Sequence, residues 1–257
     1  MRFVAGAVPV LLAACWALVA LPAPKPAPKP RPADAALAFT SSGKLIYNIE
    51  WRLIHAGTAV VDVAGHDGHV KLESAGLVSA LFKVEDTYSV RYDEPFCATG
   101  SVLDSMEGNR HRETTITFDR ARKQATFVER DVLKNTVLRS SQTDIPNCVH
   151  DVVGAIFNLR SMHLEPGQSA EIPVSDGRRA AQVKIEAQER EPVHTLAGSF
   201  NTIRYEANLL NGVVYTRKGR VFVWLSDDAR KIPVQIRLRM QFPVSTVTLQ
   251  LQKEERP

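Results

Sequence analysis

The clearest alternation of apolar and polar residues in the chain lies near its C-terminal end. Five apolar residues at alternate positions are expected on one face of a strand: Val234, Ile236, Leu238, Met240 and Phe242. The residues between them are polar, and this period of two excludes an α-helix with one apolar side. Residues 221–225, just before, are all apolar, and 226–228 read Ser-Asp-Asp, whose short side chains favour a turn. Residues 219–242 therefore predict a β hairpin that needs more sheet to cover it.

The same alternation recurs in short segments along the rest of the chain. Further strands are predicted at residues 44–56, 58–63, 70–75, 87–92, 113–118, 124–130, 136–142, 169–174, 179–189, 200–207, 213–216 and 246–251. Gly57 is expected to end the first of them, and Asp67-Gly68 to centre a turn over residues 66–69. Residues 95–104 are predicted to form a loop, whereas the pattern leaves the structure of residues 77–84 open.

One segment has helical periodicity instead. Residues 151–162 carry an apolar stripe at helical spacing, which consists of Val152, Ala155, Ile156, Leu159 and, a turn later, His163. Either Asn147 or Asp151 is expected to cap the helix, and Pro166-Gly167 follow its end. In an otherwise β chain, a single helix is expected to fill the open side of a curved sheet.

These elements predict a mainly β fold. Strands spaced by about 8–12 residues are typical of a sandwich, a barrel or a strongly curved sheet. We therefore expect a single curved antiparallel sheet, or a half-open barrel or sandwich, with one helix packed against it. Nothing with linker composition interrupts residues 39–254, so one β-rich folded domain is predicted there.

Residues 1–21 have the composition of an export signal or membrane anchor. A single positive charge precedes an apolar run over residues 3–21. Three fates of this segment stay open: cleavage after a small residue, lipid attachment at Cys15 within a lipobox-like Leu-Ala-Ala-Cys, or retention as a membrane anchor. With each fate, the protein is expected to be exported to the periplasm or cell envelope, either tethered to a membrane or soluble after cleavage.

Residues 22–38 form a linker rich in proline and lysine. Alternating prolines exclude helix and sheet, and they favour an extended polyproline spacer. Such a spacer would hold the folded domain close to a membrane through its N-terminus. Lys25, Lys29 and Arg31 either contact anionic headgroups or belong to a solvated linker without a partner.

The charge of the chain is unevenly distributed. The formal net charge is +4 and the sequence pI is about 9.0. Arg2, the three cations of the linker and Asp34 account for most of that excess, so the remaining chain is close to neutral. Because no general basic field remains and no Gly-rich phosphate loop is present, we expect no nucleic-acid partner.

Cys97 and Cys148 are the two cysteines of the predicted folded domain. In an exported domain, such a pair favours a disulfide over two free thiols. The alternative is a pair of buried thiols too far apart to bond. Because the sequence has no C-x-x-C, neither a thioredoxin-like redox motif nor a cysteine-type zinc site is indicated.

The sequence offers no catalytic constellation. There is no G-x-S-x-G, and Ser226 has no candidate base nearby. Asp227 and Asp228 are adjacent on a turn, where side chains usually point apart, so we interpret them as turn-capping residues. His66 and His69 are the one close histidine pair, and the Asp-Gly turn explains their spacing without a metal. We therefore predict no catalytic residue, no metal site and no cofactor.

Aromatic and basic residues on the predicted strands allow two interpretations. Trp51 and Trp224 could line a ligand wall, but on strands this apolar they are expected to belong to the core. Arg237 and Arg239 share a polar strand face, where they either grip an anionic headgroup or are solvated.

Three motifs occur in order: Y-N-I-E-W-R-L-I-H-A-G at 47–57, D-V-V-G-A-I-F-N-L-R at 151–160, and K-G-R-V-F-V-W-L-S-D-D-A-R-K-I-P-V at 218–234. Together they resemble the bacterial exported family known as domain of unknown function 3108, over most of residues 44–252. The resemblance implies a β-rich envelope protein and assigns no activity. The motif residues, to which we assign a structural role, are Tyr47, Trp51, Gly57, Asp151, Arg160, Gly219, Trp224, Asp227, Asp228, Arg230 and Pro233.

The leading functional hypothesis is a non-enzymatic envelope domain that binds an apolar or amphipathic, lipid-like ligand or a partner protein. The alternatives are a structural or assembly factor that docks an envelope protein through a sheet edge or the helix, and a hydrolase with an unrecognised site. A cavity lined by aliphatic side chains would favour the first hypothesis, and an exposed apolar patch the second. Histidine and carboxylate groups that converge in a cleft would favour the hydrolase.

Overall fold

The computed structural model describes residues 43–93, 96–241 and 246–255. The predicted export segment, Cys15 and the Pro/Lys-rich linker lie outside these residues. Fourteen strands run through the described part of the chain: β1 (Lys44–Trp51), β2 (Ile54–Ala64), β3 (Asp67–Ser74), β4 (Val84–Asp93), β5 (Cys97–Glu107), β6 (Arg110–Asp119), β7 (Gln124–Asp131), β8 (Thr136–Asp144), β9 (Ser169–Ser175), β10 (Ala180–Thr195), β11 (Gly198–Ala207), β12 (Gly219–Ser226), β13 (Pro233–Met240) and β14 (Thr246–Glu255). Two helices join them: α2 (Gly76–Leu81) and α3 (Val152–Arg160).

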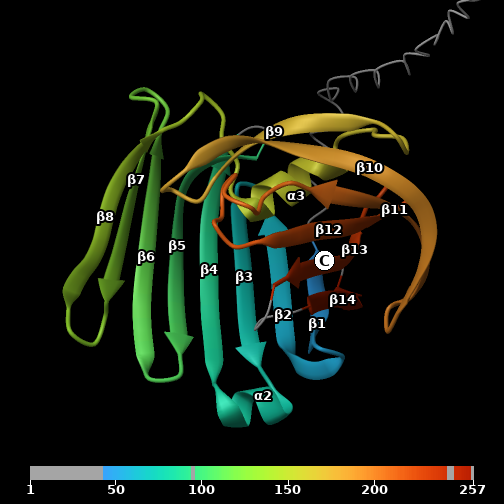
Figure 1. The fold of residues 1–257 in the computed structure, drawn as a ribbon, viewed down its shortest axis with the longest axis horizontal. Coiled ribbons are helices and arrows are strands. Elements are labelled where there is room, and N and C mark those ends of the chain that lie inside the picture. The colour runs from blue at the N-terminus through green and yellow to red at the C-terminus, as the bar shows by residue number, and fades with distance from the viewer. Residues whose placement is uncertain (1–42, 94–95, 242–245, 256–257) are drawn as a thin grey trace, which may run out of the picture.

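All fourteen strands belong to one sheet, in which every neighbouring pair is antiparallel. The order runs from β8 back to β1, continues to β14 and then runs back to β9. The first and last strands are therefore neighbours in the middle, while β8 and β9 are the edges of a sheet that does not close. Figure 1 shows the sheet curling so that the β9–β13 arm passes over α3. This confirms the predicted curved antiparallel sheet with a helix packed against it.

Helix α3 joins two hydrophobic clusters. Ala155 and Leu159 pack with strands β9–β12, whereas Phe157 packs with Tyr92 and other residues of β2–β7. The helix comes close to the sheet at Gly154, where a Cβ atom would lie 2.8 Å from the ring of Tyr92. The predicted helix is therefore present and lies between the two arms, as expected for a helix that fills the open side of a curved sheet. It is also shorter than predicted, because it ends at Arg160.

Two predicted turns lie elsewhere. The β1–β2 turn is made by Arg52 and Leu53, which adopt positive φ angles of 51° and 67°. Gly57 does not end a strand but lies inside β2, opposite Ile49 of β1 and Ser74 of β3. The next turn falls between Ala64 and Asp67, so Asp67-Gly68 begin β3 instead of centring a turn. Alternation predicted the strands, but the positive-φ residues at the first turn carry none of the usual turn chemistry.

Two connecting segments also differ from the prediction, and the structure settles a third that the sequence left open. Residues 97–104, predicted as loop, form most of β5, which pairs with both β4 and β6. The small and polar residues of this segment do not show the alternation that would predict a strand. Residues 213–216, predicted as strand, fold into a turn that buries Val214 against the α3 cluster. The open segment 77–84 contains the short helix α2. Within the described residues, no helix is long and apolar enough to cross a membrane.

The central hairpin is present as β12 and β13, with one departure from strict alternation. Val223 lies opposite Ile236 and Trp224 opposite Gln235, but Leu225 lies opposite Pro233. Val234 is thus the extra residue of a β-bulge. It packs with Phe222 and Trp224 on the opposite face from Ile236, which contradicts the prediction that Val234 and Ile236 share a face. Phe242 lies outside the described residues.

Candidate functional site

An aliphatic pocket of about 480 Å³ lies between α3 and the β9–β13 arm of the sheet. The helix contributes Ala155, Ile156 and Leu159, which belong to its predicted apolar stripe. The sheet contributes alternate residues of three strands: Val183 and Ile185 of β10, Val221 and Val223 of β12, and Ile236, Leu238 and Met240 of β13. The face of β13 that the sequence predicted to be apolar and inward therefore lines a mainly apolar pocket, whose polar side chains are Arg178, Tyr215, Thr216 and Arg217.

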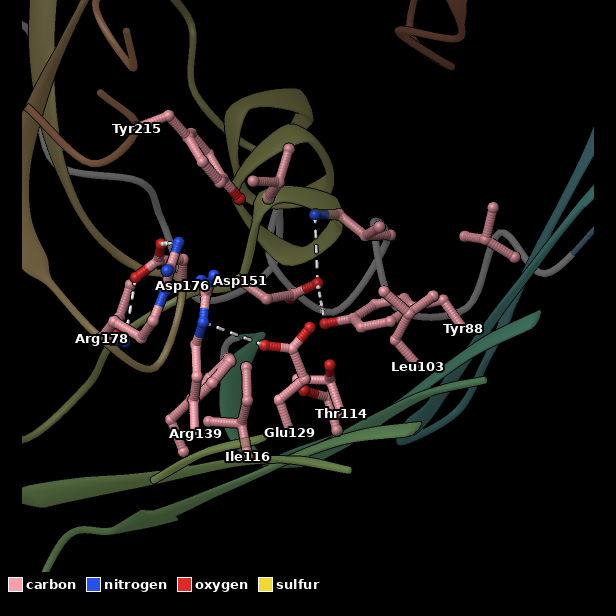
Figure 2. A pocket seen from close by; sticks show the side chains of 16 residues that line it. Tyr88, Leu103, Thr114, Ile116, Glu129, Arg139, Asp151, Asp176, Arg178 and Tyr215 are labelled. Atoms are coloured by element: carbon pink, nitrogen blue, oxygen red, sulfur yellow. Dashed lines mark hydrogen bonds and ion pairs between the residues drawn. The ribbon is translucent and has the colours of Figure 1, made fainter. Parts of the chain in front are cut away.

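A second pocket of about 470 Å³ lies on the other side of the helix N-terminus, and its lining combines apolar side chains with five charged ones: Glu129, Arg139, Asp151, Asp176 and Arg178. Figure 2 shows its side chains converging from β4–β8, the start of α3, the β9–β10 turn and Tyr215. We call this the polar pocket and the first the aliphatic pocket. Val152, Arg178 and Tyr215 line both, so the two pockets adjoin. A molecule with one apolar and one polar end could therefore occupy both at once.

Asp151 lies at the junction of helix and polar pocket. It is the N-cap of α3, which decides between the two candidates Asn147 and Asp151, and its carboxylate accepts hydrogen bonds from the backbone amides of Gly154 at 2.9 Å and Val153 at 3.2 Å. The hydroxyl of Tyr88 donates to the same carboxylate at 2.9 Å. Burial raises the pKa of Asp151 above its ordinary value, although these hydrogen bonds act in the opposite direction. Both oxygens of the Asp151 carboxylate thus accept hydrogen bonds, and these bonds fix the start of the helix.

Glu129 is a second carboxylate on the floor of the polar pocket. It shares the inner face of β7 with Ala125 and Phe127, and its side chain is only 11% exposed. Arg112 of β6 contacts one of its oxygens at 2.9 Å, and Arg139 of the edge strand β8 contacts the other at 3.5 Å. One buried carboxylate therefore faces two guanidinium groups, and the trio carries a net positive charge.

The β9–β10 turn brings a third ion pair to the polar pocket. Asp176 accepts hydrogen bonds at one oxygen from the backbone amides of Arg178 and Arg179, at 2.9 and 2.8 Å. Its other oxygen lies 3.4 Å from the Arg178 guanidinium. That guanidinium also lies over the ring of Phe127, 5.4 Å from its centroid. The turn and the ring together place Arg178 where the two pockets meet.

The predicted disulfide between Cys97 and Cys148 anchors this region. It joins the start of β5 to the segment just before α3, across a sequence separation of 51 residues. Beside it, His150 is buried and its Nδ1 lies 2.7 Å from the carbonyl oxygen of Phe96. Burial lowers the pKa of His150 below its ordinary value. The neutral ring donates from Nδ1 and leaves Nε2 to accept from Asn158, 3.4 Å away.

Several residues of the family motifs form a structural frame. The hydroxyl of Tyr47 donates to the Pro233 carbonyl at 2.8 Å, and the Arg160 guanidinium donates to the Arg230 carbonyl at 2.9 Å. The adjacent aspartates point apart. Asp227 pairs with Arg190, while Asp228 accepts from Ser226, Arg230 and backbone amides of its own turn. The pKa of Asp228 lies below its ordinary value because the bonds from Ser226 and Arg230 outweigh its partial burial.

Other residues singled out in the sequence lie away from both pockets. His66 contacts the Tyr92 carbonyl and His69 the Ser89 hydroxyl, and the described residues hold no group of three or more metal-ligating side chains. Trp224 donates to Glu191 at 2.6 Å. Arg237 stacks over that indole, at 5.0 Å from its centroid, and Arg239 over Phe222 at 5.5 Å. These tryptophan and arginine side chains therefore pack on one another on the outer face of the sheet.

Trp51 and Gly219 are also structural. Trp51 packs against the core cluster around β1 and β2, with the Arg52 guanidinium 5.0 Å from its ring centroid. Gly219 begins β12, where a Cβ atom would lie 2.4 Å from the Arg239 carbonyl oxygen. Of all the motif residues, Asp151 alone is among those lining either pocket. The remaining polar side chains of the polar pocket were not singled out in the sequence.

One signal in the sequence could have indicated the polar pocket. Glu129 continues the alternation of Ala125 and Phe127, so it is an acidic residue on the apolar face of its strand. A carboxylate in that position needs a partner inside the fold. By contrast, the inward placement of Arg178 depends on the turn that carries it. Exposed apolar side chains also occur, notably Leu53 and Leu81, but nothing among the described residues indicates what would cover them.

Comparison with known proteins places this site in a fold of unassigned function. The sequence profile of DUF3108, described as a protein of unknown function, matches residues 46–252. No curated protein matches the chain. A β-barrel-like protein of domain of unknown function DUF1849 from Brucella abortus has a similar structure, with a TM-score of 0.56 and 8% sequence identity over 84% of this chain and 98% of that one.

Two further solved structures match less well. A DUF1089 family protein from Pseudomonas aeruginosa has a TM-score of 0.39 and 14% identity, over 72% of this chain and 90% of that one. A protein with a YmcC-like fold from Bacteroides fragilis has a TM-score of 0.31 and 9% identity, over 83% of this chain and 95% of that one. Of these three likenesses, the Brucella one shows a shared β-barrel-like fold.

Proposed function

The chain belongs to the DUF3108 family, and from that premise we propose that it is a non-enzymatic binding protein of the cell envelope. Its ligand is an amphipathic, lipid-like molecule whose apolar chain occupies the aliphatic pocket. The protein holds this molecule between α3 and the β9–β13 arm, and thereby keeps an acyl or alkyl chain out of water.

The aliphatic pocket is the observation that carries this proposal. Its volume of about 480 Å³ lies within the range of roughly 300–1,000 Å³ found for small-molecule sites. Hydrocarbon transferred from water into such a lining gains about 25 cal/mol for each Å² buried. Helix α3 and all five strands of the β9–β13 arm supply aliphatic side chains, and those of β10, β12 and β13 come from alternate positions, so much of the lining follows from the sequence pattern. Such a pocket suits a flexible hydrocarbon chain better than a polar metabolite.

The proposed location rests on the sequence and on one feature of the structure. Residues 1–21 have the composition of an export segment, and the Pro/Lys-rich linker follows them. The disulfide between Cys97 and Cys148 is of a kind that persists in oxidising compartments such as the periplasm. A lipid-binding domain at the end of a stiff spacer would remain close to the membrane that supplies its ligand.

Native mass spectrometry of the full chain, purified from its own envelope, tests the proposal. We expect a bound species with the mass of a lipid or fatty acid, released on denaturation. A matched binding assay uses a fluorescent fatty acid with Leu238→Trp, which fills the aliphatic pocket, and Val137→Trp on β8, outside both pockets. We expect Leu238→Trp to weaken binding tenfold or more and Val137→Trp to leave it unchanged.

Two results would count against the proposal. One is repeated purification without any co-purified lipid, combined with no saturable binding of the fluorescent fatty acid. The other is equal binding by the wild-type protein and a folded Leu238→Trp variant, since that would place the probe outside the aliphatic pocket. Thermal unfolding of both variants distinguishes a filled pocket from a misfolded domain.

A further inference from the structure

We infer that the polar pocket receives the anionic head of the same ligand, a carboxylate or phosphate, which lies between the guanidinium groups of Arg178 and Arg139. This inference rests on the proposed function, because the tail of that ligand occupies the adjoining aliphatic pocket. The chemical class of the ligand is thereby narrowed from any lipid-like molecule to an anionic amphiphile.

The charge balance on the floor of the polar pocket supports an anion. Glu129 is the shared partner of Arg112 and Arg139, so this trio has one more positive than negative charge. Arg139 makes the longer of the two contacts, at 3.5 Å, and its side chain is 63% exposed on the edge strand β8. An incoming carboxylate or phosphate would compensate the excess charge and accept charge-assisted hydrogen bonds.

Arg178 supplies the second cation at the junction of the pockets. Its contact with Asp176 involves one carboxylate oxygen at 3.4 Å, while backbone amides occupy the other oxygen. A guanidinium carries five N–H donors in a fixed fork, so it can bind a second oxyanion beside Asp176. Because Arg178 lines both pockets, a head bound there leaves the attached chain at the entrance of the aliphatic pocket. Figure 2 shows both arginine side chains directed into the polar pocket.

The third carboxylate of the polar pocket does not oppose this assignment. Asp151 caps α3, where the backbone amides and the positive end of the helix dipole stabilise its charge. Its carboxylate is also occupied by the hydrogen bond from the Tyr88 hydroxyl. The other two carboxylates, Glu129 and Asp176, are paired with three guanidinium groups, those of Arg112, Arg139 and Arg178. The hydroxyls of Tyr215, Thr114 and Ser175 also line the polar pocket and can hydrogen-bond further substituents of the head.

The test compares ligands of one chain length that differ in the head alone. The full-length protein is titrated with a fatty acid, an alkyl phosphate, the matching fatty alcohol and the matching alkyl amine, by isothermal calorimetry below micelle-forming concentrations. We expect the two anions to bind at least tenfold more tightly than the alcohol and the amine. This preference should decrease as salt concentration rises, because screening weakens the contribution of the arginines.

Variants assign the preference to the two arginines. Arg178→Gln and Arg139→Gln should each reduce binding of the anions at least fivefold and leave binding of the alcohol unchanged. Arg178→Lys should keep part of the preference, which distinguishes charge loss from misfolding. Arg91→Gln is the matched control, since Arg91 pairs with Asp67 outside both pockets and is 76% exposed.

Each alternative outcome has a distinct meaning. If the alcohol binds as tightly as the acid, or if both glutamine variants keep the full preference, the inference is overturned while the proposed function stands. If inorganic phosphate alone binds as tightly as the alkyl phosphate, the polar pocket is a site for a free anion and its link to the tail is overturned. If none of the four amphiphiles binds, the proposed function itself fails.

Discussion

The hydroxyl of Tyr47 in β1 donates a 2.8 Å hydrogen bond to the carbonyl of Pro233, the first residue of β13. The two residues are 186 positions apart, and their strands are not neighbours, because β14 lies between them. The bond therefore spans a strand and joins the first and last family motifs. Arg160, from the middle motif, reaches the same turn through the carbonyl of Arg230. The three motifs thus meet in space at one frame, and the two hydrogen bonds that join them involve no residue that lines either pocket.

Tyr47→Phe tests this frame. The Tyr47 side chain is buried, and the substitution removes the hydroxyl that donates to the Pro233 carbonyl. We expect a loss of about 1–3 kcal/mol in the free energy of unfolding, measured by urea denaturation. Fatty-acid binding by the folded protein should not change, because Tyr47 lines neither pocket. An unchanged unfolding midpoint would show that water or another group replaces the hydroxyl at no cost.

The sequence predicted those strands and the helix whose apolar residues recur at a regular spacing. Strands of period two gave the curved sheet, and a stripe of period 3.6 gave α3, because each must bury one side. Where a single residue breaks the period, the prediction was wrong. The bulge at Val234 moves its side chain to the opposite face. The tight turn at Arg52 and Leu53 contains no glycine, so the sequence does not indicate it. Neither feature has a pattern that a single sequence displays.

The pockets were predictable only in part. The apolar lining of β13 followed from alternation, and so did the cap at Asp151. The polar pocket depends on residues from strands β3–β8, the start of α3, the β9–β10 turn and Tyr215, and the curvature of the sheet brings them together. Arg139 and Glu129 are directly opposite each other in the β7–β8 ladder, a register that the sequence did not reveal. Most of the motif residues that we singled out belong to the frame, and Asp151 alone among them lines a pocket.

Gly57→Ala should destabilise the sheet through a steric clash. A Cβ atom at Gly57 would lie 2.2 Å from the carbonyl oxygen of Glu73 in the neighbouring strand β3, and backbone on both sides resists movement. We expect a loss of about 1–3 kcal/mol or more in the free energy of unfolding. Gly100→Ala is the control, because its Cβ would lie 3.4 Å from the nearest carbonyl oxygen. Equal thermal midpoints of the two variants would contradict this account.

Removing the disulfide should destabilise the fold by an amount that its loop predicts. The bond between Cys97 and Cys148 closes a loop with a sequence separation of 51 residues, which corresponds to roughly 3–4 kcal/mol in the chain-entropy model. We expect the Cys97→Ala/Cys148→Ala variant to unfold at a lower temperature, and reductant to lower the wild-type midpoint to a similar value. Reductant should leave the variant unchanged. A wild-type midpoint that stays constant after both thiols become titratable would contradict this prediction.

The stability of the protein should also depend on pH through His150. Burial lowers the pKa of His150 from its ordinary value of 6.5, whereas in the unfolded chain the ring titrates near that value. As pH falls below 6.5, the unfolded state binds a proton that the folded state does not, so the free energy of unfolding decreases. The slope should approach about 1.4 kcal/mol per pH unit, and it should vanish again below the folded-state pKa. Above pH 6.5 this contribution to stability is complete.

Chemical denaturation between pH 7.5 and 5.5 measures this effect. The neighbouring Asp151 has a raised pKa and acts with the opposite sign, since its protonation on acidification favours the folded state. His150→Asn removes the titrating ring and should flatten the slope, even though the variant is less stable overall. His194→Asn, at an exposed position bonded to Ser199, should keep the wild-type slope. The same slope in His150→Asn and the wild type would show that another group is responsible.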